Sequence, residues 1–418
     1  MSRRSLLKLG LSSLPFLLGA PGRVSASASA PKRPRYFMLV FVAGGIDAVY
    51  TTDPKSRADV VDWVDVPYAS SAIATRGDLQ LGPHFAPLLP WADRMAIVNG
   101  VQVRTANHHT GNLQLIRLKL GIANQQVPSF TDILALHRQG QPLGTATLGP
   151  VEPRDYSAGF ISNPDYHDAA EYGPQNTFFD ELERLVPDDL ARMANALRKN
   201  AATLGGRSPE VRVTVDNMRA AAALYERLIH IPKLGAVPPG ANALARSQLR
   251  DVDRSLWTLE NDLAASVVLR LGIRDWDTHH MNATRQTRLN ATLVRALDQL
   301  LQGLASKRNE HGNLLDNTAV VVSSEIGRMP QVNEALGKDH FPEVPMMFFG
   351  APFNTGKAYG RTSTRMESLP ISLETGMPKT GGHMMAFDDV GTTLLRVFGI
   401  EPSRYGYFGK TMPFLAHV

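Results

Sequence analysis

The chain has 418 residues, of which 43% are apolar, with a formal net charge of +5 and no cysteine. This length and composition suit one large α/β domain or two smaller ones, with a core that needs no covalent cross-links. The lack of cysteine excludes disulfides, thiolate ligands and a cysteine nucleophile, so any metal must be held by His, Asp and Glu.

Residues 1–30 form a separate segment. Ser2-Arg3-Arg4-Ser5-Leu6-Leu7-Lys8 precedes an apolar stretch and then Ala26-Ser27-Ala28-Ser29-Ala30, a pattern typical of a twin-arginine export signal. We predict cleavage after Ala28 and a periplasmic or secreted protein. The alternative is a basic N-terminus on a short membrane anchor, but a spanning helix needs about 18 apolar residues or more, and this run is shorter. No later stretch predicts a membrane span.

The export signal also accounts for most of the net charge. Residues 1–30 hold four bases and no acid, so the rest of the chain carries a formal charge of +1. A nucleic-acid partner is therefore not expected, because such proteins carry a concentrated basic surface.

Five continuous apolar runs predict strands that are buried on both faces, as in a parallel sheet. Each run ends at or near a glycine or a polar residue. In chain order the runs are Tyr36–Val42, Met95–Val98, Ser266–Leu271, Ala319–Val322 and Val344–Phe349.

Between these runs, apolar residues recur at spacings of three and four, which predicts helices. The predicted helices are Phe130–Arg138, Pro209–Ile231, Gln248–Leu263, Ala283–Gly303 and Asp388–Phe398. Alternation of strands and helices favours a doubly wound α/β sheet with crossover helices. Residues 151–207 lack a clear period, and we interpret them as an insertion or cap over the sheet edge.

Acids and histidines follow the predicted strands. They are Asp47 after Gly44-Gly45, Asp277 with His279 and His280, Glu325 after Ser323-Ser324, and Asp339 with His340. Because strand ends in an open α/β sheet converge on one crevice, these side chains can meet, and hard oxygen and nitrogen donors suit a divalent metal.

Each of these residues also has an ordinary structural interpretation. Asp47 suits a turn or a helix cap, and Asp277 suits the N-cap of the next helix, with the histidines on the surface. Glu325 is costly to bury unpaired, so it either binds a cation or forms an ion pair with a base such as Arg328. Asp339 and His340 also suit a surface loop.

A further polar segment, Asn107-His108-His109-Thr110-Gly111, follows the second predicted strand. If hydrolysis proceeds through a covalent step, the hydroxyl of Thr105 or Thr110 is the candidate nucleophile, activated by a metal. His108 or His109 is a candidate to bind or protonate the leaving group. His383, before the last predicted helix, is a candidate metal ligand or a residue of a capping loop.

Several of these segments, in this order, resemble the motifs of an exported bacterial family catalogued as "domain of unknown function 1501". The resemblance covers nearly all of the chain after the signal. The segments are Gly44-Gly45-Ile46-Asp47, Leu81-Gly82-Pro83-His84-Phe85, Asn107-His108-His109, Trp276-Asp277-Thr278-His279, Ser324-Glu325-Ile326-Gly327-Arg328, Asp339-His340 and Gly382-His383.

The resemblance implies membership of the alkaline phosphatase and sulfatase superfamily, with a three-layer α/β/α fold and a two-metal site at the strand ends. It implies that Asp47 and Glu325 hold one ion, and that Asp277, His279 or His280, and His340 hold the other.

The sequence departs from the superfamily pattern at two positions of the first ion site. Glu325 stands where an Asp is usual, and Ile326 stands where a partner histidine is usual. The first site is therefore short of a ligand unless His109 or His383 supplies it. Arg328, in the same motif, is a candidate catalytic residue.

Two hypotheses of function follow from these residues. The first is an exported hydrolase of phosphate or sulfate esters that uses one or two divalent ions, Zn²⁺, Mn²⁺ or Ca²⁺, on a small-molecule or glycan substrate. The second is a non-catalytic envelope protein that keeps the fold and one ion to bind a glycan or a partner. A hydrolase of another ester or amide also fits the same metals, and the oligomeric state stays open.

Overall fold

The computed structural model describes residues 33–121, 128–137, 143–149, 187–204, 243–272 and 274–418, with single positions between 215 and 226. The predicted export signal and most of the predicted helix Pro209–Ile231 lie outside the described residues. Of the predicted cap at 151–207, the structure describes the helix α4 (Pro187–Leu204).

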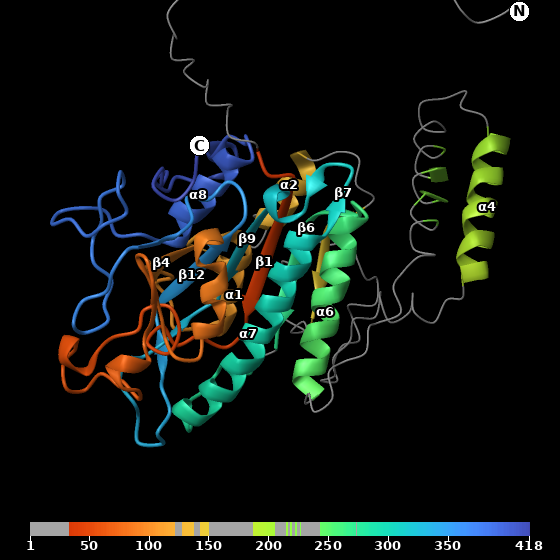
Figure 1. The fold of residues 1–418 in the computed structure, drawn as a ribbon. Coiled ribbons are helices and arrows are strands. Elements are labelled where there is room, and N and C mark those ends of the chain that lie inside the picture. Colours follow the sequence, from red (N-terminus) through yellow and green to blue (C-terminus); the bar gives the residue numbers. More distant parts are fainter. Residues whose placement is uncertain are drawn as a thin grey trace, which may run out of the picture. The chain divides into compact units, whose positions relative to one another are not determined.

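The centre of the fold is a seven-stranded sheet with the order β13-β4-β12-β9-β1-β6-β5 (Figure 1). All five predicted strands are present, and β5 and β13 join them. The strands are β1 (Tyr36–Val42), β4 (Met95–Gln102), β5 (Leu143–Leu148), β6 (Ala264–Leu271), β9 (Thr318–Ser323), β12 (Glu343–Phe349) and β13 (Lys357–Tyr359).

The sheet is mostly parallel. β1 runs parallel to both β6 and β9, while β12 runs antiparallel to its neighbours β4 and β9. The expectation of parallel strands is therefore wrong for β12. A continuous apolar run indicates that both faces of the strand are buried. It does not indicate the direction in which the strand runs.

Helices cover both faces of the sheet. In β1, Met38 and Val40 belong to the core cluster that includes residues of α6 (Ala243–Glu260) and α7 (Asn282–Ser306). Figure 1 shows α6 and α7 side by side along that face. The alternate residues Phe37, Leu39 and Phe41 pack in the second cluster, with residues of α1 (His108–Arg117), α2 (Phe130–His137) and α8 (Phe387–Val397). The fold is thus the expected three-layer α/β/α arrangement.

Four of the predicted helices are confirmed within a few residues, as α2, α6, α7 and α8. The helix α1 was not predicted, because its first turn reads His-His-Thr-Gly. It begins where Asn107 caps it, with the side-chain oxygen of Asn107 accepting a hydrogen bond from the Thr110 amide. This cap places His108 in the first turn of the helix.

Short elements complete the described structure. The strands are β2 (Ala74–Arg76), β3 (Leu79–Leu81), β7 (Arg308–Asn309), β8 (Gly312–Asn313), β10 (Gly327–Arg328) and β11 (His340–Phe341). The 3-10 helices are η1 (Arg57–Asp59), η2 (Ser70–Ala72), η3 (Ala86–Arg94), η4 (Leu315–Asn317) and η5 (Pro402–Tyr405).

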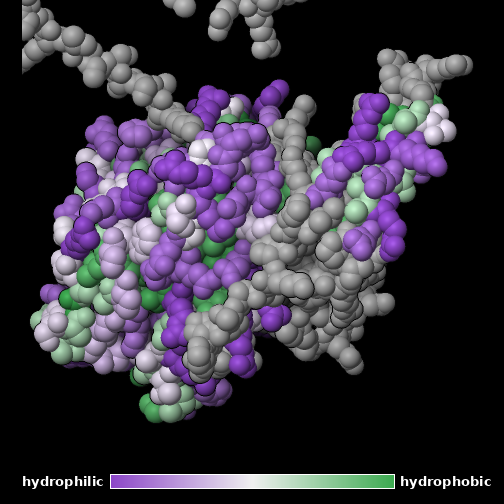
Figure 2. All heavy atoms as spheres, turned by 45° about the vertical axis from the view of Figure 1, so that its right-hand side comes forward, coloured by the Kyte–Doolittle hydropathy of each residue, from purple (hydrophilic) through white to green (hydrophobic). Residues whose placement is uncertain are grey.

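The face in Figure 2 is mostly hydrophilic, with apolar side chains in small separate areas. None of the helices among the described residues combines the length and apolar character needed to cross a membrane.

The carboxyl ends of β9, β1 and β6 lie side by side, because these strands are neighbours in the sheet. The segments that leave them carry Glu325, Asp47 and Asp277 in turn. The backbones approach closely here: a Cβ atom on Gly44, which has φ of +117°, would lie 2.4 Å from the Asp277 amide nitrogen. Only glycine fits this position, and the contact brings the acids together.

Candidate metal centre

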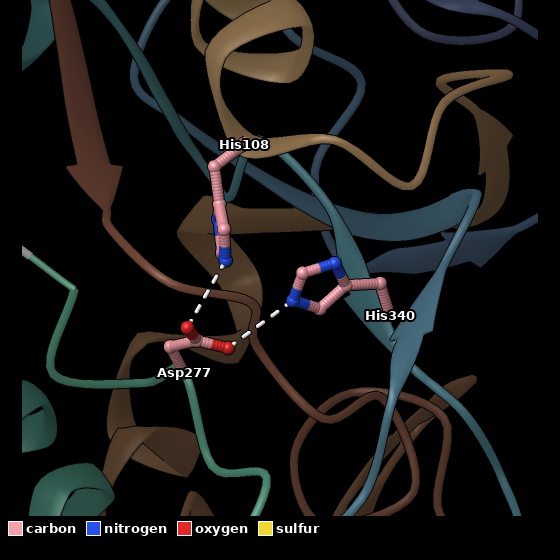
Figure 3. Close-up of side chains that lie close together, drawn as sticks. All are labelled: His108, Asp277 and His340. Atoms are coloured by element: carbon pink, nitrogen blue, oxygen red, sulfur yellow. Dashed lines mark hydrogen bonds and ion pairs between the residues drawn. The ribbon is translucent and has the colours of Figure 1, made fainter.

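Three imidazoles converge on one carboxylate at the carboxyl edge of the sheet. Asp277 Oδ2 lies 3.2 Å from His108 Nε2, and Asp277 Oδ1 lies 3.2 Å from His340 Nε2 and 3.1 Å from His279 Nε2. Figure 3 shows the rings of His108 and His340 pointing toward the oxygens of Asp277. We call His108, Asp277, His279 and His340 the Asp277 cluster.

The other nitrogen of each ring faces an oxygen acceptor. His340 Nδ1 lies 2.6 Å from the Ala106 carbonyl oxygen, His108 Nδ1 lies 2.7 Å from Glu325 Oε1, and His279 Nδ1 lies 2.9 Å from Asp339 Oδ1. Carbonyl and carboxylate oxygens only accept hydrogen bonds, so each Nδ1 carries the hydrogen. Each neutral ring then has its lone pair on Nε2, directed at the other members of the cluster.

Such an arrangement concentrates electron pairs. His279 Nε2 and His340 Nε2 are only 2.9 Å apart, and His108 Nε2 lies 3.2 Å from the negatively charged Asp277 Oδ2. Lone pairs and a carboxylate this close together repel one another, and a cation or protons between these atoms remove the repulsion. The cluster therefore fits a bound metal, with three nitrogen donors and one carboxylate, a set typical of zinc.

The electrostatics keep the carboxylate charged. Burial alone would raise the pKa of Asp277, but hydrogen bonds from His108 and His340 and the charge of Arg328 hold that pKa well below its usual range. Burial alone would lower the pKa of His108, yet its contacts with Asp277 and Glu325 raise it to about 9. In the metal-free protein His108 thus carries a second proton where an ion would otherwise lie, and metal binding releases it.

Glu325 lies behind His108. Its buried carboxylate accepts hydrogen bonds from the Gly44 amide, at 2.9 and 3.1 Å, and from the Ser324 hydroxyl, at 3.1 Å, in addition to its contact with His108. The base that Glu325 contacts is thus His108. This contact orients the ring, as carboxylates beside metal-bound histidines do.

Arg328 holds the carboxylate from the other side. Its buried guanidinium donates to Asp277 Oδ1 at 2.8 Å, to the Lys338 carbonyl at 3.0 Å and to the Gly44 carbonyl. Burial lowers the pKa of Arg328, and the charge of Asp277 opposes that shift. These contacts hold the Asp277 carboxylate against the backbone of two other segments of the chain.

Asp47 lies beside the cluster in a separate ion pair. Its carboxylate is 2.8 Å from Lys338 Nζ and accepts hydrogen bonds from Asn282 Nδ2 at 3.0 Å and from the Val49 amide at 3.1 Å. Asp339 and His340 were predicted as site residues, but the neighbouring Lys338 was not. A lysine is normally solvated, and only its position next to an Asp-His pair could have drawn attention to it.

The structure places the other candidate residues as follows. His383 pairs with Asp389 at the start of α8, at 2.8 Å. Thr105 Oγ1 accepts from the Asn107 amide at 3.1 Å. Among the residues that the structure describes, no hydrogen bond or ion pair joins the Asp277 cluster to the side chain of any of the following: Thr105, His109, Thr110, His280 and His383.

Residues 35–413 match the family described as "Protein of unknown function (DUF1501)". The chain belongs to this family. This match confirms the family that the sequence motifs predicted for the DUF1501 chain. No curated protein matches the sequence.

Solved structures resemble the DUF1501 chain over most of its length at low identity. The lipoteichoic acid synthase LtaP from Listeria monocytogenes shares 8% identity, with 92% of this chain and 77% of that chain covered and a TM-score of 0.44. A putative sulfatase from Bacteroides thetaiotaomicron shares 10%, with coverages of 92% and 75% and a TM-score of 0.37. A protein solved with its substrate D-glucosamine-2-N,6-O-disulfate shares 13%, with coverages of 92% and 81% and a TM-score of 0.39.

Proposed function

We propose that this chain is an exported, metal-dependent hydrolase of phosphate or sulfate esters. The observation that carries the proposal is the convergence of three histidine Nε2 atoms on the Asp277 carboxylate, each ring held by an acceptor at its Nδ1. Export is proposed from the twin-arginine pattern in residues 1–30.

His108, Asp277, His279 and His340 would hold the ion. Zn²⁺ fits three nitrogens and a carboxylate better than Mn²⁺ or Ca²⁺, which favour oxygen ligands. When bound, a divalent ion here supplies a Lewis acid for an ester oxygen and lowers the pKa of a water molecule.

The chain's own groups fix the orientation of these ligands. Glu325, Asp339 and the Ala106 carbonyl hold the three rings in one tautomer, and Arg328 holds the carboxylate. Ligands fixed in this way need no rearrangement when the ion or the substrate binds, and this preorganisation is what catalysis requires.

The N-terminus of α1 favours an anionic substrate. The helix begins at His108, so the partial positive charge of its first turn lies at the Asp277 cluster. A phosphate or sulfate group of a small molecule or glycan suits this position beside a cation. Thr105 and Thr110 flank His108 in sequence and are the proposed candidates for the nucleophile.

A second candidate function is a non-catalytic envelope protein that uses the same ion to bind a glycan or a partner. The observation that favours it is the position of the Thr105 hydroxyl, which accepts a hydrogen bond from the Asn107 amide instead of contacting the Asp277 cluster. A bound ion without an activated hydroxyl or water would bind an anion but not cleave it.

Turnover distinguishes these functions. Mature protein stripped of metal and reloaded with Zn²⁺, Mn²⁺ or Ca²⁺ is assayed on an aryl phosphate, an aryl phosphodiester and an aryl sulfate. We expect metal-dependent turnover that His340→Ala abolishes, and that His417→Ala, a change at an exposed histidine, leaves intact. Metal binding with no turnover on any of the three would reject the hydrolase and leave the binding protein.

The contact between Asp339 and His279 gives a graded test of ligand orientation. Asp339→Ala removes the acceptor at His279 Nδ1 and should weaken Zn²⁺ binding by about tenfold or more. The Asp339 side chain is 61% exposed, so the change should leave folding intact. Competition with a chromophoric chelator measures the affinity. Asp78→Ala, at an exposed aspartate, is the matched control, and equal affinities for the two variants would contradict the orienting role.

A further inference from the structure

A buried cation lies beside the Asp277 cluster. The side chain of Lys338 is 0% exposed, and its Nζ lies 2.8 Å from Asp47 Oδ2 and 3.3 Å from Asp65 Oδ2. The ring of Tyr50 adds a cation-π contact, with its centroid 4.8 Å from Nζ. Two carboxylates and an aromatic face thus surround one ammonium group.

The backbone fixes Lys338 in this place. Its amide donates to the Thr278 carbonyl at 3.0 Å, and its carbonyl accepts from Arg328 at 3.0 Å. Thr278 lies between two members of the Asp277 cluster in sequence. The ammonium group is therefore a fixed, buried charge next to the metal centre and not a mobile charge on the surface.

The two acids assigned to a further ion by the family resemblance are already satisfied by protein groups. Asp47 has Lys338, Asn282 and the Val49 amide, and Glu325 has His108, Ser324 and the Gly44 amide. A second ion at Asp47 would have to displace the ammonium from the carboxylate, leaving a buried charge without its partner.

The balance of charges around the Asp277 cluster also favours a single ion. Four carboxylates, of Asp47, Asp65, Asp277 and Glu325, meet two fixed cations, of Lys338 and Arg328. With neutral imidazoles two negative charges remain, and a single divalent ion offsets them. A second would add two positive charges to a region with low solvent access, at a large desolvation cost.

We propose that the centre binds a single divalent ion at the Asp277 cluster, and that the Lys338 ammonium takes the place of a second ion at Asp47. This inference rests on the proposed metal-dependent function and differs from the two-ion arrangement that the family resemblance implies.

Metal stoichiometry tests the inference. Mature protein is stripped of metal and titrated with Zn²⁺ by calorimetry, and its metal content after gel filtration is measured by mass spectrometry. We expect one equivalent in the wild type. The double variant Asp47→Asn/Lys338→Met, which removes both charges and keeps similar volumes, should also bind one equivalent, with an affinity within threefold of the wild type.

The possible results separate this inference from the proposed function. Two equivalents in the wild type would overturn the single-ion inference and leave a metal-dependent function standing. Loss of the ion from the double variant, with its circular dichroism unchanged, would make Asp47 a ligand and also overturn the inference. No bound metal in the wild type would overturn both proposals.

Discussion

Asp277→Ala is expected to reduce bound Zn²⁺ to below about a tenth of an equivalent, because this residue supplies the only carboxylate among the four proposed ligands. Both of its oxygens lie within 3.2 Å of histidine Nε2 atoms, so its removal leaves the three rings without a common partner. Turnover should fall by about a thousandfold, since a catalytic ion contributes several kcal/mol to the reaction barrier.

The same substitution leaves the buried Arg328 guanidinium without its carboxylate, so loss of metal has to be separated from loss of fold. Asp277→Asn keeps the size of the side chain and an oxygen that can accept from Arg328. We expect this variant to remain folded, as measured by circular dichroism. It should bind Zn²⁺ much more weakly than the wild type, because a neutral amide is a weaker metal ligand than a carboxylate.

Asp78→Ala is the matched control for Asp277→Ala. Asp78 is exposed in the turn between β2 and β3, and its removal should change neither metal content nor turnover. The proposal fails if Asp277→Ala and Asp277→Asn both retain a full equivalent of Zn²⁺.

The fold was predictable from the sequence where burial dominates. The run that forms β1 is apolar throughout, β9 is apolar between its first and last residues, and both strands are fully buried. The strand β5, Leu-Gly-Thr-Ala-Thr-Leu, was missed because small and polar residues interrupt its apolar pattern. The direction of β12 could not be predicted either, since it depends on the path of the connecting chain and not on the composition of the strand.

The site was predictable in part, for a different physical reason. Convergence of strand ends predicted that Asp277, His279 and His340 would meet, and the structure brings them together. His108 was assigned to leaving-group chemistry, because its position at the start of α1 depends on a helix that the sequence did not reveal. The sequence pattern around Asp47 is the same whether this carboxylate binds a metal ion or pairs with a lysine. The partner of Asp47 could therefore not be predicted.

Lys338→Met should destabilise the metal-free protein by about 3–5 kcal/mol, because it leaves the buried Asp47 carboxylate without its partner. Asp47 is only 1% exposed, and water cannot replace the ammonium. Urea unfolding of the stripped protein measures the change. Lys379→Met, at an exposed lysine, is the matched control and should alter the free energy of unfolding by less than about 0.5 kcal/mol.

The double variant Asp47→Asn/Lys338→Met completes a thermodynamic cycle around this pair. Removing both charges should recover most of the stability lost in Lys338→Met, because the remaining carboxylate, Asp65, is partly exposed and keeps its hydrogen bond from Tyr50. If Lys338→Met alone unfolds with the wild-type free energy, the ammonium is not the buried partner of Asp47. The double variant could instead remain as unstable as Lys338→Met. In that case the backbone contacts of residue 338 with Thr278 and Arg328 are not enough to hold this part of the chain. The ammonium group itself then anchors the segment that carries His340.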